Sequence, residues 1–321
     1  MLLLKGMSGE AWSLSKLLPG ILVHFILGLA LLTNQKLSAD AYLADDRIYY
    51  GADTYNINYK EEIITARGNA YFRKGSASVF ATRIVIHYGE NEKRAFFFNK
   101  VRLLDKEAAY ELRGDYGEGY FKDDFYIVTG NVMFIDGERR ILAGRAETMS
   151  LDDFYFTEEV TYSDESVTIR SQRLDLSEED SALFQDDVHA VFAENGDELY
   201  CRTLTHFFET GNDEFRDDVI YIQKESGNED DEPLIIKAEL VQYYHDDDFF
   251  LLMDSVYATN GSYSLKGPMV KYFRDQQVLE SIGSTVIHDG QRTIYCDRLS
   301  LNVAEGEIAF FGSIQGVFDV E

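Results

Sequence analysis

The stretch TARGNAYFRKGSASVFATRIVIHY, residues 65–88, sets the pattern for most of the chain. Apolar and polar residues alternate on both sides of two turn-like pairs, Gly68-Asn69 and Lys74-Gly75. Such alternation is typical of a β-strand that buries one face. A diverged copy, VTGNVMFIDGERRILAGRAETMSL, follows at residues 128–151. The chain therefore repeats a unit made of strands and tight turns.

The repeat extends over almost the whole chain. Small apolar residues recur about every 30 residues, each after a polar residue or glycine and before an alternating run. These anchor positions are Ala70, Val101, Val132, Val160, Val188, Val219, Val256, Val286 and Val317. The longest interval contains KESGNEDDEP, residues 224–233, which we interpret as an acidic loop insertion. We expect each unit to contain a strand, a turn, a strand, a tight hairpin turn and a strand.

The turn chemistry decides between two all-β architectures. Asp-Gly and Asn-Gly pairs, such as Asp136-Gly137 and Asp289-Gly290, favour hairpins because both residues tolerate positive φ. A parallel β-helix needs no hairpins, so we predict an elongated, twisted antiparallel β-jellyroll. We expect it to be built as a solenoid-like stack over residues 42–321.

The charge balance excludes one class of function. The chain has 30 Lys and Arg against 57 Asp and Glu, a net charge of −27. Nucleic-acid binding requires basic residues that neutralise phosphates, so such a role is not expected.

The first 41 residues differ from the rest. An uncharged apolar run, residues 17–32, follows two lysines and precedes an Ala-Asp-Ala sequence at 39–41. A charged start, an apolar run and a small-residue exit are typical of an export signal. A retained membrane anchor is the alternative, since the run is only slightly shorter than the roughly 20 residues of a membrane span. Either interpretation places residues 42–321 in an exported compartment.

Motifs for chemistry are absent from the sequence. The six histidines lack metal-ligand spacing, and no nucleophile elbow or phosphate-binding loop occurs. We therefore expect no catalytic residues, no metal site and no cofactor. Cys201 and Cys296 lie in different repeats, three steps apart in the stack. Three steps amount to about 14 Å, beyond the ~7 Å reach of a disulfide, so both should be free thiols.

Two apolar stripes run through the repeats, one from each set of strands. Aligned by the stack, they form either a closed core or the wall of an open groove, and residue type alone favours the core. The residues predicted to line the groove, if it is open, are Phe72, Ile84, Ile86, Leu103, Phe134, Tyr162, Leu174, Leu204, Tyr221 and Leu240.

The opening stretch resembles the signature of the OstA-like (organic-solvent-tolerance) family, which includes the LptA-type periplasmic bridge proteins of lipopolysaccharide transport. The matching positions are Thr65, Ala66, Gly68, Asn69, Gly75, Ala81, Ile84 and Tyr88. The likeness is specific over residues 43–151, and only the period and the anchors carry it to residue 321. Later copies depart from it, with Glu159 and Asp187 in place of the asparagine.

The resemblance implies a fold, a slightly open β-jellyroll, and a function. A member of this family would be a periplasmic, non-enzymatic lipid-binding protein that passes lipopolysaccharide or a related glycolipid toward the outer membrane. Its partners would be acyl chains and related jellyroll proteins, or further copies of itself, joined edge to edge. The alternative is a periplasmic or surface β-repeat scaffold with a dry, closed core and no lipid cargo.

Overall fold

The computed structural model describes residues 48–89, 93–123, 125–149, 153–177, 181–224 and 232–318. The predicted export signal or anchor, residues 1–41, and most of the acidic insertion lie outside these ranges. Within them the secondary structure consists of strands and turns. The described residues contain no helix with the length and hydrophobicity of a membrane span.

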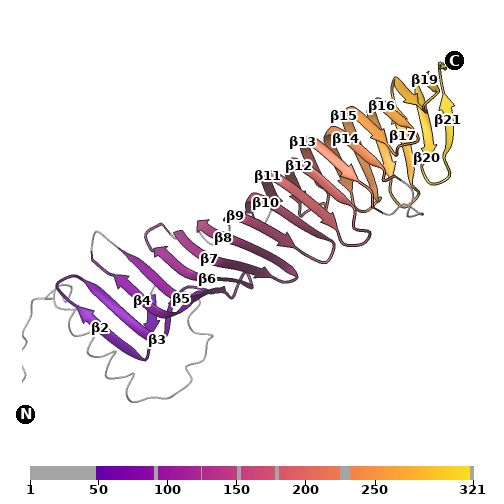
Figure 1. Cartoon of the computed structure of the whole chain (residues 1–321). Coiled ribbons are helices and arrows are strands. Elements are labelled where there is room, and N and C mark those ends of the chain that lie inside the picture. Colours follow the sequence, from indigo (N-terminus) through magenta and orange to yellow (C-terminus); the bar gives the residue numbers. More distant parts are fainter. Residues whose placement is uncertain are drawn as a thin grey trace, which may run out of the picture. The chain divides into compact units, whose positions relative to one another are not determined.

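In the described part of the chain, twenty-two strands form one antiparallel sheet that does not close on itself (Figure 1). This confirms the predicted all-β antiparallel architecture. The strands are β1 (Ile48–Gly51), β2 (Thr54–Asn58), β3 (Ile63–Lys74), β4 (Ala77–His87), β5 (Arg94–Asp105), β6 (Tyr110–Tyr120), β7 (Phe125–Asp136), β8 (Arg139–Met149), β9 (Asp153–Ser163), β10 (Val167–Ser177), β11 (Ser181–Phe192), β12 (Glu198–Phe207), β13 (Asp213–Ile222), β14 (Ile235–Tyr244), β15 (Phe249–Thr259), β16 (Ser264–Phe273), β17 (Val278–Ile282), β18 (Thr285–His288), β19 (Arg292–Cys296), β20 (Arg298–Asn302), β21 (Glu307–Phe311) and β22 (Gln315–Phe318).

From β3 to β16 each strand pairs with the next in sequence order. At the amino-terminal end, the two halves of β3 pair with separate short strands, β1 and β2. At the other end, β16 pairs with β17 through one half and with β18 through the other. The division of the terminal strands shows that every long strand has two halves.

A bent corner separates these halves. In β3, Gly68 and Asn69 both adopt left-handed backbone angles, with φ of 74° and 43°. Arg67 pairs with Arg83 and Ala70 with Ala81, so the pair forms a β-bulge opposite a single residue of β4. Equivalent left-handed pairs are Asn99-Lys100, Gly130-Asn131, Glu158-Glu159, Asp186-Asp187, Asp217-Asp218 and Asp254-Ser255.

The corners fold the sheet into two half-sheets. Half-sheet A contains β2, the first half of each odd-numbered strand from β3 to β15 and the second half of each even-numbered strand from β4 to β16. Half-sheet B contains β1 and the other halves. Beyond β16, the short strands β17, β20 and β21 continue half-sheet A, and β18, β19 and β22 continue half-sheet B. In β3 the buried residues on either side of the corner, Ala66 and Ala70, are four residues apart, an even number that keeps the alternation unchanged. In β4 the corresponding buried residues, Ala81 and Ile84, are three residues apart. Both half-sheets therefore bury the same side of the sheet.

The unit differs from the predicted one in one respect. The Gly75 and Gly137 turns, each at φ of 57°, are hairpins as expected. The Gly-Asn pair, however, bends one continuous strand instead of joining two strands. Each repeat of about 30 residues is thus two long bent strands.

The cysteines are free and buried, in agreement with the prediction. Cys201 lies in β12 and Cys296 in β19, so the pairing order β12-β13-β14-β15-β16-β18-β19 separates them by six steps in half-sheet B. The expected three steps were wrong because each repeat contributes two strands. Burial raises the pKa of Cys201 to about 12.

The corner geometry predicts a clear mutational contrast. Asp187 is exposed and has a φ of 54°. Replacement by valine should lower the free energy of unfolding by about 1–2 kcal/mol, because a β-branched residue is strained in the left-handed region. Replacement by glycine should be neutral or slightly stabilising. Urea unfolding of both variants measures the contrast, and equal destabilisation by the two residues would contradict a left-handed corner.

Candidate functional site: the apolar interior and its seam

The interior between the half-sheets is a continuous apolar core. The buried hydrophobic residues form one cluster that extends from Ile64 to Leu301. Aromatic rings of half-sheet B contact rings of half-sheet A across it. In two such pairs the ring centroids lie 4.9 Å apart, for Phe134 and Phe154, and 5.5 Å apart, for Tyr162 and Phe184. Each ring pair adds about 0.5–1.5 kcal/mol to the stability that burial itself provides.

Nine of the ten predicted groove residues are buried in this interior. They are Phe72, Ile84, Ile86, Leu103, Phe134, Tyr162, Leu174, Leu204 and Tyr221. Leu240 is only half-buried, and its neighbour Val241 takes the interior position. The prediction counted three residues from Lys237, whereas the buried residue before the corner of β14 is Ala238, so the predicted position fell one residue short. In β14 the buried residues step from Ala238 to Val241.

Several large interior rings were not named from the sequence. Phe97, Phe156, Phe184, Phe250 and Tyr272 are all fully buried. They lie in half-sheet A at alternate positions of their strands, so the period-two pattern was the signal that could have identified them. The prediction instead followed the anchors, which mark half-sheet B in the odd-numbered strands.

Opposite the corners, the half-sheets meet along a seam formed by the turns at the strand ends. Among the described residues no strand pairing crosses this seam, and side chains bridge it. The guanidinium of Arg139 lies 4.9 Å from the ring of Phe208. Arg274 forms an ion pair of 2.9 Å with Glu194. These side-chain contacts, unlike a backbone ladder, can separate without breaking secondary structure.

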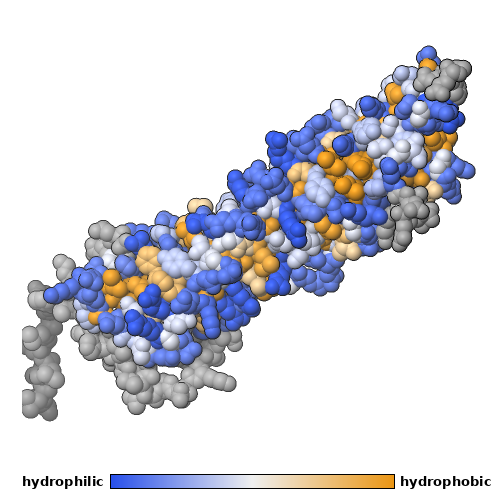
Figure 2. All heavy atoms as spheres, in the orientation of Figure 1, coloured by the Kyte–Doolittle hydropathy of each residue, from blue (hydrophilic) through white to orange (hydrophobic). Residues whose placement is uncertain are grey.

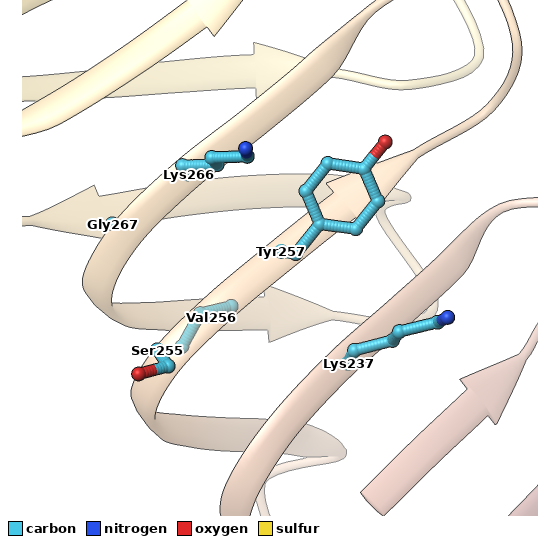
Figure 3. A pocket seen from close by; sticks show the side chains of 6 residues that line it. All are labelled: Lys237, Ser255, Val256, Tyr257, Lys266 and Gly267. Carbon is cyan, nitrogen blue, oxygen red and sulfur yellow. The ribbon is translucent and has the colours of Figure 1, made fainter.

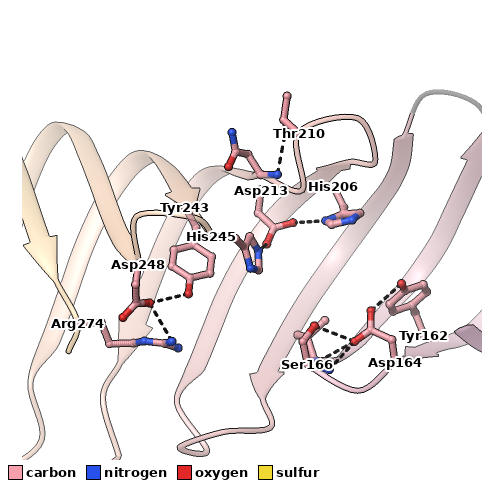
Figure 4. Close-up of polar contacts among 12 residues, drawn as sticks. Tyr162, Asp164, Ser166, His206, Thr210, Asp213, Tyr243, His245, Asp248 and Arg274 are labelled. Carbon is pink, nitrogen blue, oxygen red and sulfur yellow. Dashed lines mark hydrogen bonds and ion pairs between the residues drawn. The ribbon is translucent and has the colours of Figure 1, made fainter. Parts of the chain in front are cut away.

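A carboxylate held by two imidazoles lies on the half-sheet A side of the seam (Figure 4). The oxygens of Asp213 are 2.8 Å from Nδ1 of His206 and 2.8 Å from Nε2 of His245. Asp213 is only 8% exposed, and both rings can donate to it while neutral. The two imidazoles thereby satisfy a buried carboxylate that would otherwise be costly.

Tyrosines extend from the interior to this seam. The hydroxyl of Tyr221 donates to Asp197 at 2.5 Å, and that of Tyr243 donates to Asp248 at 2.8 Å. Asp248 also forms an ion pair of 2.8 Å with Arg274. Burial raises the pKa of both tyrosines, so their hydroxyls stay protonated as donors. The rings thus contribute apolar surface inside and polar groups at the seam.

The site combines hydrogen-bonded polar groups with an apolar interior. Each imidazole of the His206–Asp213–His245 group directs one ring nitrogen to the carboxylate. Among the residues that the structure describes, no group of three or more His, Cys, Asp or Glu side chains could hold a metal ion. The interior offers an apolar environment, and the seam offers charged groups of both signs.

The fold and site define an all-β repeat protein with an apolar interior and one seam that no backbone pairing closes in the described ranges. No protein-family model and no curated protein matches the sequence. Among solved structures, the chain is similar to LptH of Pseudomonas aeruginosa, described as the LptA-homologous periplasmic component of the lipopolysaccharide transport device. The match has 15% identity and a TM-score of 0.25, and it covers 45% of this chain and 81% of LptH. A likeness at this level assigns no function to the chain.

The seam gives a prediction for acid stability. Asp164 accepts hydrogen bonds from the Tyr162 hydroxyl and from the backbone N–H groups of Ser166 and Val167. Burial alone would raise the pKa of this carboxyl, but the hydrogen bonds outweigh it and hold the pKa below its usual value. The stabilisation is therefore present above the ordinary pKa and is lost as the pH falls through the lower folded value.

Asp164→Asn tests this effect, with Asp246→Asn at an exposed turn position as the control. The Asp164 variant should lose stability at a pH of about 7 and show a smaller further loss at about 3 than the wild type does. Urea unfolding at the two pH values measures the difference. An unchanged pH dependence would show that Asp164 does not contribute to acid sensitivity.

Proposed function

We propose that the chain is a non-enzymatic lipid-binding protein of the periplasm that carries the acyl chains of lipopolysaccharide or a related glycolipid in its interior toward the outer membrane. The observation that supports this most is the continuous apolar interior beside a seam that only side chains bridge. Apolar chains that enter through the seam would remain shielded from water over many repeats. The buried groove residues would then form the wall that contacts the acyl chains.

A dry scaffold is the second candidate, and a specific observation favours it. Rings contact each other across the interior, as in Phe134 with Phe156 at 5.6 Å and Tyr221 with Phe250 at 4.9 Å. An acyl chain must therefore displace ring contacts, each of which costs about 0.5–1.5 kcal/mol. Burial of a methylene group returns about 0.8 kcal/mol, so a chain of several methylenes outweighs a few such contacts.

The ends of the sheet support assembly. β1 and β2 pair only with β3, and β21 and β22 pair only with β20 and β19 within the described residues. Large apolar side chains are exposed at both ends and elsewhere on the surface (Figure 2). Those at the ends are Ile48, Tyr50, Tyr55, Tyr59, Phe311, Ile314 and Val317. Strand edges with apolar side chains are templates for adding another strand, so we propose edge-to-edge joining with further copies or related jellyroll proteins.

Photo-crosslinking separates the lipid carrier from the scaffold. p-Benzoylphenylalanine replaces the buried ring of Phe134, and the exposed ring of Tyr155 serves as a matched control. The full chain is produced in a bacterium that makes lipopolysaccharide and irradiated before purification. A carrier should give a lipid adduct at position 134 and none at position 155, measured by intact mass. No adduct at position 134 in a folded protein, or equal adducts at both positions, would support the scaffold.

Proline substitution tests the assembly. Ile48→Pro in β1 and Phe318→Pro in β22 each remove a backbone donor from a terminal strand. Each lost hydrogen bond should weaken association by about fivefold, since it is worth about 1 kcal/mol. Light scattering over a concentration series compares them with Ile48→Thr, which keeps the donor. A wild type that stays monomeric at every concentration, alone and with candidate partners, would end the edge-joining model.

A further inference from the structure

One row of outward-facing residues crosses half-sheet B without an acidic side chain. Its members are directly paired from strand to strand. They are Tyr71, Phe80, Arg102, Arg113, Met133, Leu142, Thr161, Arg170, His189, Tyr200, Ile220, Lys237, Tyr257, Lys266, Val286, Tyr295 and Gln315. With 57 acidic residues among 321, an acid-free row of this length departs from the composition of the chain.

Three neighbours in this row border a surface pocket at the β14-β15-β16 end. Tyr257 pairs with Lys237 on one side and with Lys266 on the other. The pocket also reaches Ser255, Val256 and Gly267 at the corner and has a volume of about 590 Å³. The two lysine side chains and the Tyr257 ring project to the same side of the sheet (Figure 3).

Neither lysine has a counter-ion within the part of the chain that the structure describes. Among the described residues, no carboxylate forms an ion pair with Lys237 or Lys266, although Arg102 and Arg113 in the same row both pair with Glu111. The ammonium of Lys266 lies 5.6 Å from the centre of the Tyr257 ring. Two unpaired cations beside one tyrosine are unexpected in a chain with a net charge of −27.

We propose that Lys237, Tyr257 and Lys266 bind a phosphate group of a phosphomonoester. The two lysines are two strand steps apart, about 10 Å, and their flexible stems can bring both ammonium groups over the intervening tyrosine. The Tyr257 hydroxyl supplies a third donor, which matches the three terminal oxygens of a phosphomonoester. Because the chain as a whole repels anions, a bound phosphate depends on these local contacts. This site lies on the outer surface and is independent of lipid carriage in the interior.

Binding is measured with the full chain and two sources of the same chemical group. Glycerol 3-phosphate, followed by calorimetry, represents a soluble phosphomonoester. Phosphatidylcholine vesicles with and without phosphatidic acid, followed by co-sedimentation, represent a lipid headgroup. Binding of glycerol 3-phosphate identifies a site open to soluble ligands, and binding of phosphatidic acid vesicles alone identifies a headgroup site.

The double variant Lys237→Gln/Lys266→Gln should weaken binding at least about tenfold, since one charge-assisted hydrogen bond has that value. Lys237→Arg/Lys266→Arg should retain it. Lys271→Gln is the matched control, because this lysine lies beside the Phe249 ring on half-sheet A. Unchanged melting temperatures show that all variants fold. No binding of either probe, or an equal loss with Lys271→Gln, would overturn the proposal.

Discussion

The fold depends on pairs of consecutive residues held in the left-handed backbone region. An extended antiparallel sheet has no intrinsic reason to fold over itself, and its apolar side would face water. The pair in each odd-numbered strand from β3 to β15 supplies the bend at nearly the same position of each repeat. Only then do the two half-sheets turn the same buried side toward each other. Core packing, the seam and the surface pocket all follow from this local backbone choice.

The acidic character of the chain is partly a consequence of the same constraint. Asparagine and aspartate are enriched among left-handed residues because their short polar side chains bond locally. The corners at Asp186-Asp187 and Asp217-Asp218 use two aspartates each, where the first repeat uses Gly68-Asn69. Glu158-Glu159 lacks this local advantage and has no comparable explanation. The corners therefore concentrate carboxylates along the line where the sheet bends, while the acid-free outer row of half-sheet B has none.

Much of the architecture was predictable because it rests on local signals. Alternation indicated strands, Asp-Gly and Lys-Gly pairs indicated hairpins, and the spacing of the anchors indicated the repeat. The bend was harder to predict, since Gly68-Asn69 is compatible with either a turn between two strands or a bulge within one. That ambiguity led to the wrong number of steps between Cys201 and Cys296. The β14 pattern was started at Lys237 instead of Ala238, which put Leu240 in place of Val241. The seam could not be predicted, because Asp213 and Arg274 find their partners only once the turns of different repeats are side by side.

Pairing that is limited to sequence neighbours makes the length of the sheet an adjustable property. From β4 to β15, within the described residues, each strand hydrogen-bonds only to the strand before it and the strand after it. Duplication of one repeat would add two strands and about 10 Å to the ladder without changing the pairing of any other repeat. Removal of one would shorten it by the same amount. The molecule can thus serve as a ruler whose length evolution sets by gene-segment copying, independently of the chemistry at any one repeat.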